Sequence, residues 1–255
     1  MLLEGALPVV WDAPPGVGAL MSTRLGGVSA APYTSLNLGL AVGDDAAAVA
    51  ENRRRFAAAT GAEPVWLRQV HGSRVVRLDG DQQPGSARHL DADAAWTDLP
   101  GLACVVQVAD CLPLLLAHRD GRAVAAAHAG WRGLAAGVVE ATVKALCEGS
   151  RSQPRDLLAW LGPCIGPRQF EVGEEVLAAF AEDTRHFNRR PRPEGAARWL
   201  ADLPALARTR LERLGVQHVS GGGWCSVEDA SRFFSFRRDG VTGRMAAAIW
   251  RRGGC

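Results

Sequence analysis

A short polar turn between two apolar runs constrains this chain more than any other feature. Asp120-Gly121 separates the apolar residues 112–118 from 123–128. Asp-Gly between two such runs is a strong signal for a β-hairpin with a two-residue type I′ turn. With these two residues as the loop, Pro113 pairs with His128. The register of two strands is therefore predicted from a few residues.

This register makes Cys111 and His128 neighbours. Side chains alternate across a strand, so Cys111, two residues before Pro113, lies on the same sheet face as His128. Diagonal neighbours of this kind are roughly 7–8 Å apart at Cα, a gap that two side chains can close. Pro113 cannot donate a hydrogen bond to the sheet, which favours an open site at the rim over a closed one in the core.

A further histidine, His71, stands in a separate motif, Arg-Gln-Val-His-Gly (68–72). Two imidazoles and a thiolate suit a borderline divalent metal, zinc above all, and three protein ligands leave one coordination position open. The same three residues also fit a nucleophilic cysteine activated by a histidine. Spacing alone does not bring His71 to the hairpin, because a histidine before glycine is also typical of a surface turn.

Helix and strand signals occur in mixed order and predict an α+β fold with mixed or antiparallel sheets flanked by helices. Helices are expected at 45–60, 134–147, 174–182 and 203–214, with Gly61 and Gly215 as stop signals. Strands are expected at 102–108, 112–118, 123–128, 157–161, 216–220 and 245–250. The proline- and arginine-rich stretch 185–198 is expected to be a solvated loop.

Length and composition indicate one globular domain over residues 1–255. A formal net charge of +2 gives no reason to expect nucleic acid or an anionic membrane as partner. The apolar runs are too short to span a bilayer, and without a secretory signal the expected compartment is the cytoplasm. The six cysteines are then expected to be thiols or metal ligands rather than disulfides.

An ordered set of motifs runs through nearly the whole chain. They are Thr-Arg-Leu-Gly-Gly-Val-Ser (23–29), Ser-Leu-Asn-Leu-Gly (35–39), Val-Gly-Asp-Asp (42–45), Asn-Arg (52–53), Gln-Val-His-Gly (69–72), Asp-Ala-Asp-Ala (91–94), Ala-Asp-Cys (109–111), His-Ala-Gly-Trp-Arg-Gly (128–133), Gly-Pro-Cys-Ile-Gly-Pro (162–167), Phe-Phe-Ser-Phe-Arg-Arg-Asp-Gly (233–240) and Thr-Gly-Arg (242–244). With them the chain resembles the laccase-domain family, also called the peptidoglycan editing factor or purine nucleoside phosphorylase family. One departure lies at Cys225, which is followed by Ser-Val-Glu-Asp, where relatives often have Thr and an aromatic residue.

The resemblance implies a fold similar to the catalytic domain of cytotoxic necrotizing factor toxins. It also implies a zinc site at His71, Cys111 and His128, with copper as the alternative metal because copper binds nitrogen and sulfur more tightly. The implied reactions are phosphorolysis of adenosine, inosine and methylthioadenosine, and hydrolytic deamination of adenosine. Purine nucleosides and phosphate are the expected partners, with no nucleic acid or membrane, and the protein is expected to be a monomer.

Several polar residues in these motifs are candidate substrate contacts. Phosphorolysis needs a site for an anion, and the candidates for it are Arg24, Arg68 and Arg132. For Arg132, which follows a glycine-rich turn, a surface ion pair is an equal alternative. Asn37 and Gln69 are candidates for hydrogen bonds to ribose or base, and Asp110 for orienting a ligand or moving a proton.

Two other functions compete with a purine nucleoside enzyme. The family's older label is a copper-dependent polyphenol oxidase, but a laccase copper array needs many histidines, typically in His-x-His pairs, and this chain has six histidines and no such pair. A cysteine hydrolase or amidase that edits peptidoglycan precursors would use Cys111 activated by His128. A purely structural metal is disfavoured, because three ligands from three glycine-flanked segments are typical of an open site.

Overall fold

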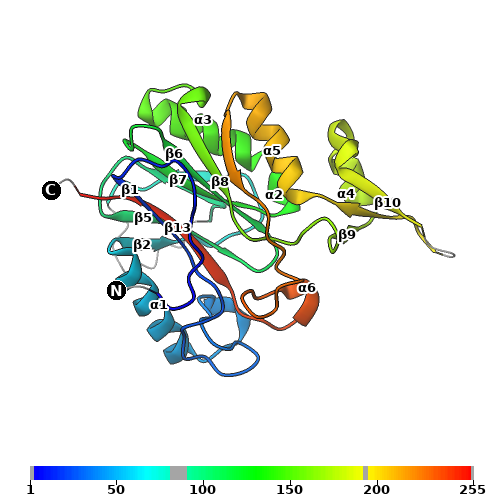
Figure 1. Cartoon of the computed structure of the whole chain (residues 1–255), viewed down its shortest axis with the longest axis horizontal. Helices are drawn as coiled ribbons and strands as arrows, with labels where there is room; N and C mark the ends of the chain where they lie inside the picture. Colours follow the sequence, from blue (N-terminus) through cyan, green and yellow to red (C-terminus); the bar gives the residue numbers. More distant parts are fainter. Residues whose placement is uncertain (1–2, 81–90, 192–194, 254–255) are drawn as a thin grey trace.

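Two sheets stacked face to face form the centre of the computed structural model, which describes residues 3–80, 91–191 and 195–253 (Figure 1). The four-stranded sheet has the order β1 (Val17–Met21), β13 (Met245–Arg251), β5 (Leu102–Val108), β2 (Glu63–Trp66). The six-stranded sheet has the order β12 (His218–Gly221), β8 (Leu157–Leu161), β6 (Leu112–His118), β7 (Val124–Ala129), β4 (Ala94–Thr97), β3 (Val75–Arg77). Parallel and antiparallel pairs occur in both, as predicted.

Strand alternation divides the core into layers. On β6 and β7, Leu115 and Ala126 pack against the four-stranded sheet, whereas Leu114 and Ala127 pack against helices on the other face. These strands are buried on both faces, so they read as continuous apolar runs in the sequence. Between the sheets, Ile249 and Trp160 belong to the same apolar cluster. The β6–β7 hairpin is thus the centre of the molecule.

Helices cover the two outer faces of this sandwich (Figure 1). Helix α1 (Ala46–Thr60) packs on the four-stranded sheet through Phe56, and α3 (Val138–Ser150) and α5 (Leu203–Leu214) cover the six-stranded sheet. The predicted caps of α1 and α5 are confirmed, since Asp45 accepts from the amide of Ala48 at 3.1 Å and both helices end at a left-handed glycine. The helix expected at 134–147 is wrong as one element. Gly137, at φ 88°, separates α2 (Trp131–Ala135) from α3.

The hairpin prediction is confirmed in register and wrong in turn type. Pro113 pairs with His128, and the amide of His118 donates to the carbonyl of Ala123 at 2.9 Å. A type I′ turn needs positive φ at both central residues, but of Asp120 and Gly121 only Gly121 has it. The amide of Gly121 instead donates to the carbonyl of His118 at 2.7 Å, which makes a four-residue loop with the same register.

The stretch expected as a solvated loop contributes to an arm beside the sandwich (Figure 1). Residues 187–190 and 198–201 form antiparallel strands β10 (Phe187–Arg190) and β11 (Arg198–Ala201), which join β9 (Glu171–Val172). Phe187 is buried, while the other three residues of β10 are exposed. This arginine-rich stretch therefore contains a strand, β10, that is anchored by one buried aromatic residue. The helix expected at 174–182 is split into α4 (Glu174–Ala179) and a 3₁₀ helix (Ala181–His186).

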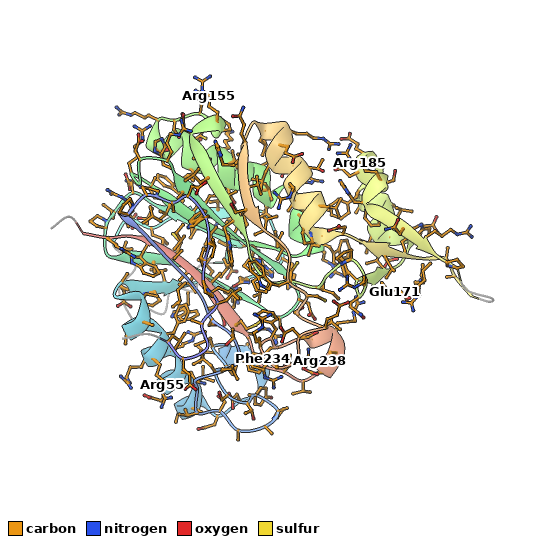
Figure 2. The ribbon with its side chains drawn as sticks, viewed as in Figure 1. Arg55, Arg155, Glu171, Arg185, Phe234 and Arg238 are labelled. Carbon is orange, nitrogen blue, oxygen red and sulfur yellow. The ribbon has the colours of Figure 1, made fainter. Side chains whose placement is uncertain are left out.

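The strands expected at 102–108, 112–118 and 157–161 are confirmed with the same bounds. The other three expected strands differ by one or two residues at their ends, as is usual for element boundaries. Many of the arginines lie at the periphery, as Arg155 and Arg185 do in Figure 2. Arg238 is instead half-buried and donates to the carbonyls of Ser226 and Phe233 next to the short helix α6 (Phe236–Asp239). No helix in the described part of the chain is long and apolar enough to cross a membrane.

Candidate metal centre

His71, Cys111 and His128 meet where the chain crosses between the two sheets. The loop from β2 to β3 leaves the four-stranded sheet and enters the six-stranded one, and it carries His71. The link from β5 to β6 makes the same crossing and carries Cys111. His128 lies near the end of β7, paired with Pro113. All three side chains therefore collect at one rim of the sandwich, as the hairpin register predicts for two of them.

The three side chains form a compact cluster. Their ligand atoms all lie within 4.8 Å of one another, with Cys111 Sγ 3.8 Å from His71 Nε2. The two imidazole rings are 4.8 Å apart at an interplanar angle of 80°. His128 is buried, Cys111 is half-buried and His71 is exposed. The cluster is therefore closed on the His128 side and open to solvent on the His71 side.

Asp93 orients this cluster, a role that the sequence analysis did not assign. Its buried carboxylate accepts from the amides of Val70, His71 and Gly72 at 2.7–3.1 Å. His128 Nδ1 lies 2.9 Å from Asp93 Oδ1. Because an ionised carboxylate only accepts hydrogen bonds, Nδ1 carries the proton and Nε2 is left for a ligand.

The Asp-Ala-Asp-Ala motif offered a sequence signal for this role. Asp93 directly precedes an apolar strand, and a buried carboxylate there needs a hydrogen-bond partner. Burial raises the pKa of this carboxyl, but the hydrogen bonds from His128 and from the Gly72 and Val70 amides outweigh burial and lower it. The converging amides also account for the backbone of His71, whose φ of 59° lies in the left-handed region. Such strain concentrates at functional sites.

Two glycines let the backbone approach the cluster. A Cβ on Gly130 would lie 2.8 Å from Cys111 Sγ and 3.1 Å from His71 Cδ2. A Cβ on Gly133 would lie 2.8 Å from the carbonyl oxygen of Gly72. Any larger residue at either place would displace a ligand or the loop that carries it.

The charges in the cluster favour a thiolate and an imidazolium when no metal is bound. Burial raises the pKa of Cys111, but the charges and hydrogen bonds of His128 and His71 lower it to about 6. Burial lowers the pKa of His128, but the Cys111 thiolate and Asp93 raise it to about 9. This cluster therefore provides a deprotonated sulfur at neutral pH, which is the form that binds metals.

The donor set fits a tetrahedral metal ion. Zinc binds sulfur at about 2.3 Å and imidazole nitrogen at about 2.0–2.1 Å, which places the two donors roughly 3.5 Å apart. The observed 3.8 Å between Cys111 Sγ and His71 Nε2 is close to this value. His128 offers Nε2 because Asp93 holds Nδ1. The three residues can thus hold one metal and leave a fourth position toward solvent.

Arg24, Asn37 and Arg68 each donate hydrogen bonds to other groups of the protein. Arg24 donates through Nε to the carbonyl of Thr34 and through Nη1 to that of Ala230. Asn37 is fully buried, and its amide makes hydrogen bonds to Gly39, Asp44 and Arg244 that use every polar position. Arg68 forms a bidentate ion pair with Asp91.

The other three predicted substrate contacts are Gln69, Asp110 and Arg132. Gln69 pairs with the main chain of Gln107, donating to its carbonyl at 2.8 Å and accepting from its amide at 2.7 Å, which fastens the His71 loop to β5. Asp110 accepts from Ser226 Oγ and from the Arg237 amide, both at 2.6 Å. Arg132 is exposed and stacks on Trp131 at 4.3 Å.

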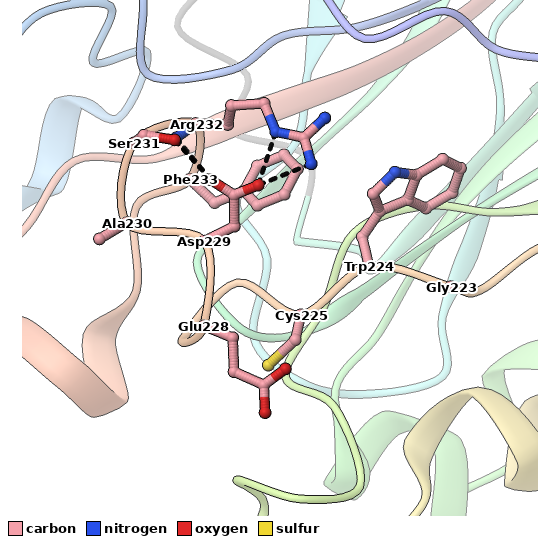
Figure 3. A pocket seen from close by; sticks show the side chains of 9 residues that line it. All are labelled: Gly223, Trp224, Cys225, Glu228, Asp229, Ala230, Ser231, Arg232 and Phe233. Carbon is pink, nitrogen blue, oxygen red and sulfur yellow. Dashed lines mark hydrogen bonds and ion pairs between the residues drawn. The ribbon is translucent and has the colours of Figure 1, made fainter.

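A hollow of about 600 Å³ lies on the segment that follows β12. It adjoins the Cys111 segment, because Ser226 Oγ donates to Asp110 and the backbones of Cys225 and Cys164 form an isolated β-bridge. Figure 3 shows the Trp224 ring to one side of the Asp229–Arg232 ion pair, with the Cys225 sulfur below them. Its lining residues are Gly223, Trp224, Cys225, Glu228, Asp229, Ala230, Ser231, Arg232 and Phe233. The cysteines in the described part of the chain are free thiols, and Cys255 lies outside it.

Comparison with known proteins matches this chain to one family over almost its whole length. The family model described as multi-copper polyphenol oxidoreductase laccase matches residues 18–252. A purine nucleoside phosphorylase of Pseudomonas aeruginosa is 51% identical over 245 residues, covering 94% of this chain and 96% of that protein. Purine nucleoside phosphorylase YfiH of Escherichia coli is 49% identical over 242 residues, with the same coverage. The crystal structure of a Neisseria meningitidis protein has a TM-score of 0.89 and 44% identity, covering 98% of this chain and all of that one.

Proposed function

The chain belongs to the multi-copper polyphenol oxidoreductase laccase family, and because similar proteins are named purine nucleoside phosphorylases, we propose that it cleaves purine nucleosides with phosphate. The observation that carries the proposal is the open His71–Cys111–His128 cluster at the rim of the sandwich. Adenosine, inosine and methylthioadenosine are the proposed substrates, and zinc is the proposed metal.

Phosphorolysis exchanges one bond at C1′ of the ribose. An oxygen of phosphate forms a bond to C1′, the C1′–N9 bond breaks, and the purine leaves with that electron pair and takes up a proton. The products are ribose 1-phosphate and the free base. When bound, zinc supplies a Lewis acid that stabilises developing negative charge. The chain must supply the metal ligands, a site for the phosphate and a surface for the nucleoside.

Asp93 and His128 supply the fixed geometry that this reaction needs. Asp93 holds the protonated Nδ1 of His128 at 2.9 Å and, through three amides, holds the loop of His71. The cluster is therefore oriented before a substrate arrives, which avoids reorganisation during the reaction. Exposure of His71 leaves the approach on that side open to a nucleoside.

The test combines product analysis with metal analysis. Purified protein is incubated with inosine or adenosine, with and without phosphate, and the products are separated by chromatography. Phosphate-dependent release of the base, lost in Cys111→Ala together with one bound metal per chain, supports the proposal. Intact nucleosides after incubation with fully metal-loaded protein contradict it.

Adenosine deamination is a second proposed activity of the same site. Zinc deaminases also use a small set of histidine and cysteine ligands with one position open, which is the donor set found at His71, Cys111 and His128. Formation of inosine from adenosine in the absence of phosphate is the expected result. The same incubation with Cys111→Ala should leave adenosine unchanged.

A cysteine hydrolase remains the alternative function, and one observation favours it. Cys111, His128 and Asp93 follow each other like a nucleophile, a base and an orienting carboxylate. Metal content separates the two readings, because a metal bound through Cys111 Sγ blocks its attack. Purified protein that contains no zinc or copper, and that cleaves an amino-acid-substituted cell-wall precursor, would establish the hydrolase. Copper found in place of zinc would instead support a copper-dependent polyphenol oxidase.

A further inference from the structure

Arg244 lies at the same rim as the metal cluster, although the sequence analysis assigned it no role. It immediately precedes β13, and Met245 pairs with Val108 at the end of β5. Continuing that antiparallel register places Arg244 beside Ala109, next to the Asp110-Cys111 crossing. Sheet pairing alone therefore brings a guanidinium group to the Cys111 segment.

The main chain and one edge of the guanidinium are held firmly. The amide of Arg244 donates to Asn37 Oδ1 at 2.8 Å, and Nη1 donates to the carbonyls of Thr242 at 3.0 Å and Gly243 at 3.1 Å. A Cβ on Gly39 would lie 2.7 Å from Arg244 Cγ, so a glycine is needed there for the side chain to pass. Asn37, expected to touch the substrate, instead helps to position Arg244.

The other edge of the same guanidinium is open. Nε and Nη2 have no hydrogen-bond partner among the described residues, and neither is among the buried unpaired side-chain atoms. The residue is half-buried, so this edge reaches solvent from a partly desolvated position. The Nε–Nη2 edge is the fork that binds two oxygens of a phosphate or carboxylate side by side.

Arg244 differs in this respect from the arginines that the sequence favoured. In Arg24, Nε and Nη1 donate to carbonyls, and in Arg68 the Nε–Nη2 edge binds Asp91. Arg132 has no carboxylate partner among the described residues, but it is exposed. Burial lowers the pKa of Arg244 and outweighs the charges of Cys111 and Asp110, which raise it; that these two charges act on Arg244 agrees with its position beside Ala109.

We propose that Arg244 binds the phosphate of the phosphorolysis reaction through its Nε–Nη2 fork. This inference rests on the proposed function and names the residue that serves its second substrate. Two phosphate oxygens held by the fork leave the remaining ones free, and one of these forms the bond to C1′. The exposed ring of Phe236, 6.0 Å from Arg244 Cζ, gives the nucleoside an apolar surface beside this anion.

The test compares Arg244→Gln and Arg244→Lys with the wild type in the metal-loaded protein. With inosine saturating, the KM for phosphate should rise about 10- to 100-fold in Arg244→Gln, the loss expected for a charge-assisted pair of hydrogen bonds. Arg244→Lys keeps the charge without the fork and should lie between. The KM for inosine and the metal content should stay within about twofold. Arg155→Gln, which changes an exposed arginine just before β8, at the turn end of the β6–β7 hairpin, is the matched control.

A binding measurement without turnover separates this inference from the proposed function. Inorganic phosphate is titrated into each protein by calorimetry, and heat should appear with the wild type and Arg155→Gln and disappear with Arg244→Gln. An unchanged phosphate KM in Arg244→Gln, or the same loss in Arg132→Gln instead, overturns the inference while phosphorolysis stands. A wild type that binds phosphate at Arg244 but cleaves no nucleoside overturns the proposed function and leaves Arg244 as an anion site.

Discussion

The β6–β7 hairpin carries a buried histidine near each end, His118 at the turn and His128 at the rim, and their surroundings shift the two pKa values in opposite directions. At the turn, His118 Nδ1 accepts from the Asp120 amide at 3.0 Å, and Arg122 Nη2 lies 2.8 Å from its other ring nitrogen. Burial and the Arg122 charge lower the pKa of His118, and they outweigh the carboxylates of Asp120 and Asp156, which raise it. At the rim, Cys111 and Asp93 overcome burial and raise the pKa of His128 to about 9.

Burial is nearly equal at the two ends, since His118 is 1% and His128 is 3% exposed. The partner charge therefore decides whether a buried histidine stays neutral and structural or is prepared for a ligand. This difference gives five predictions.

The largest effect is expected from removing the rim histidine. His128→Asn should lose bound metal and reduce phosphorolysis by ~10³-fold or more, beyond the cost of an outer-sphere partner, because a ligand is gone. Metal analysis and chromatographic rates measure both. His118→Asn, the matched change at the turn, should keep both the bound metal and the phosphorolysis rate. Equal losses in the two variants would show that the two histidines do not differ in role.

Next in size is the reactivity of Cys111 in metal-free protein. Because the pKa of Cys111 is about 6, its rate of alkylation by iodoacetamide should rise with pH, with a midpoint near pH 6. Below this pH the thiolate is protonated and the rate should fall. Cys147, whose pKa burial raises, is the internal control, and mass spectrometry reports both sites. A midpoint for Cys111 near that of an ordinary thiol would refute the charge pair.

Asp93→Asn should weaken metal binding about 10- to 100-fold, the usual cost of losing the carboxylate behind a histidine ligand. The amide can no longer hold His128 Nδ1–H and the three loop amides together. Competition with a chromophoric chelator measures the affinity. Asp98→Asn, which removes a more exposed ion pair with Arg77, should leave it unchanged, and an unaltered affinity in Asp93→Asn would remove Asp93 from the site.

Gly130→Ala should weaken metal binding by up to about tenfold, less than the loss of Asp93. The new Cβ would press on Cys111 Sγ and the ring of His71, while the backbone at Gly130, with φ −65°, accepts alanine without strain. The same chelator assay applies. Gly16→Ala, where a Cβ meets nothing within 4 Å, is the control that should not change.

The smallest effect concerns pH and the turn. The pKa of folded His118 lies below its unfolded value, so as pH falls below about 6.5 the unfolded chain takes up a proton that the folded one resists. His118 therefore lowers the free energy of unfolding in acid and leaves it unchanged at neutral pH. His118→Asn should make the urea midpoint fall less between pH 7 and pH 5 than it does in the wild type. An equal fall in both would show that His118 does not titrate.

Local signals predicted the hairpin register because strand alternation and a short loop leave few options. They also placed the caps of α1 and α5, where a single side chain or glycine decides the end. They misjudged the β6–β7 turn and the break at Gly137, where neighbours in space select the conformation. Strand β10, within residues 185–198, was missed because one buried aromatic residue, Phe187, outweighs the composition of its neighbours.

The sequence by itself determined that Cys111 and His128 would be partners, since pairing and alternation act over a few residues. Its motifs also named the family and placed His71 in the set by resemblance. Only the tertiary structure brought His71 to the rim, because its loop crosses from one sheet to the other. Strand pairing brought Asp93 beside His128 through β4 and β7, and Arg244 beside the Cys111 segment through β13 and β5. Such pairings join strands that are far apart in the chain, which no local spacing encodes.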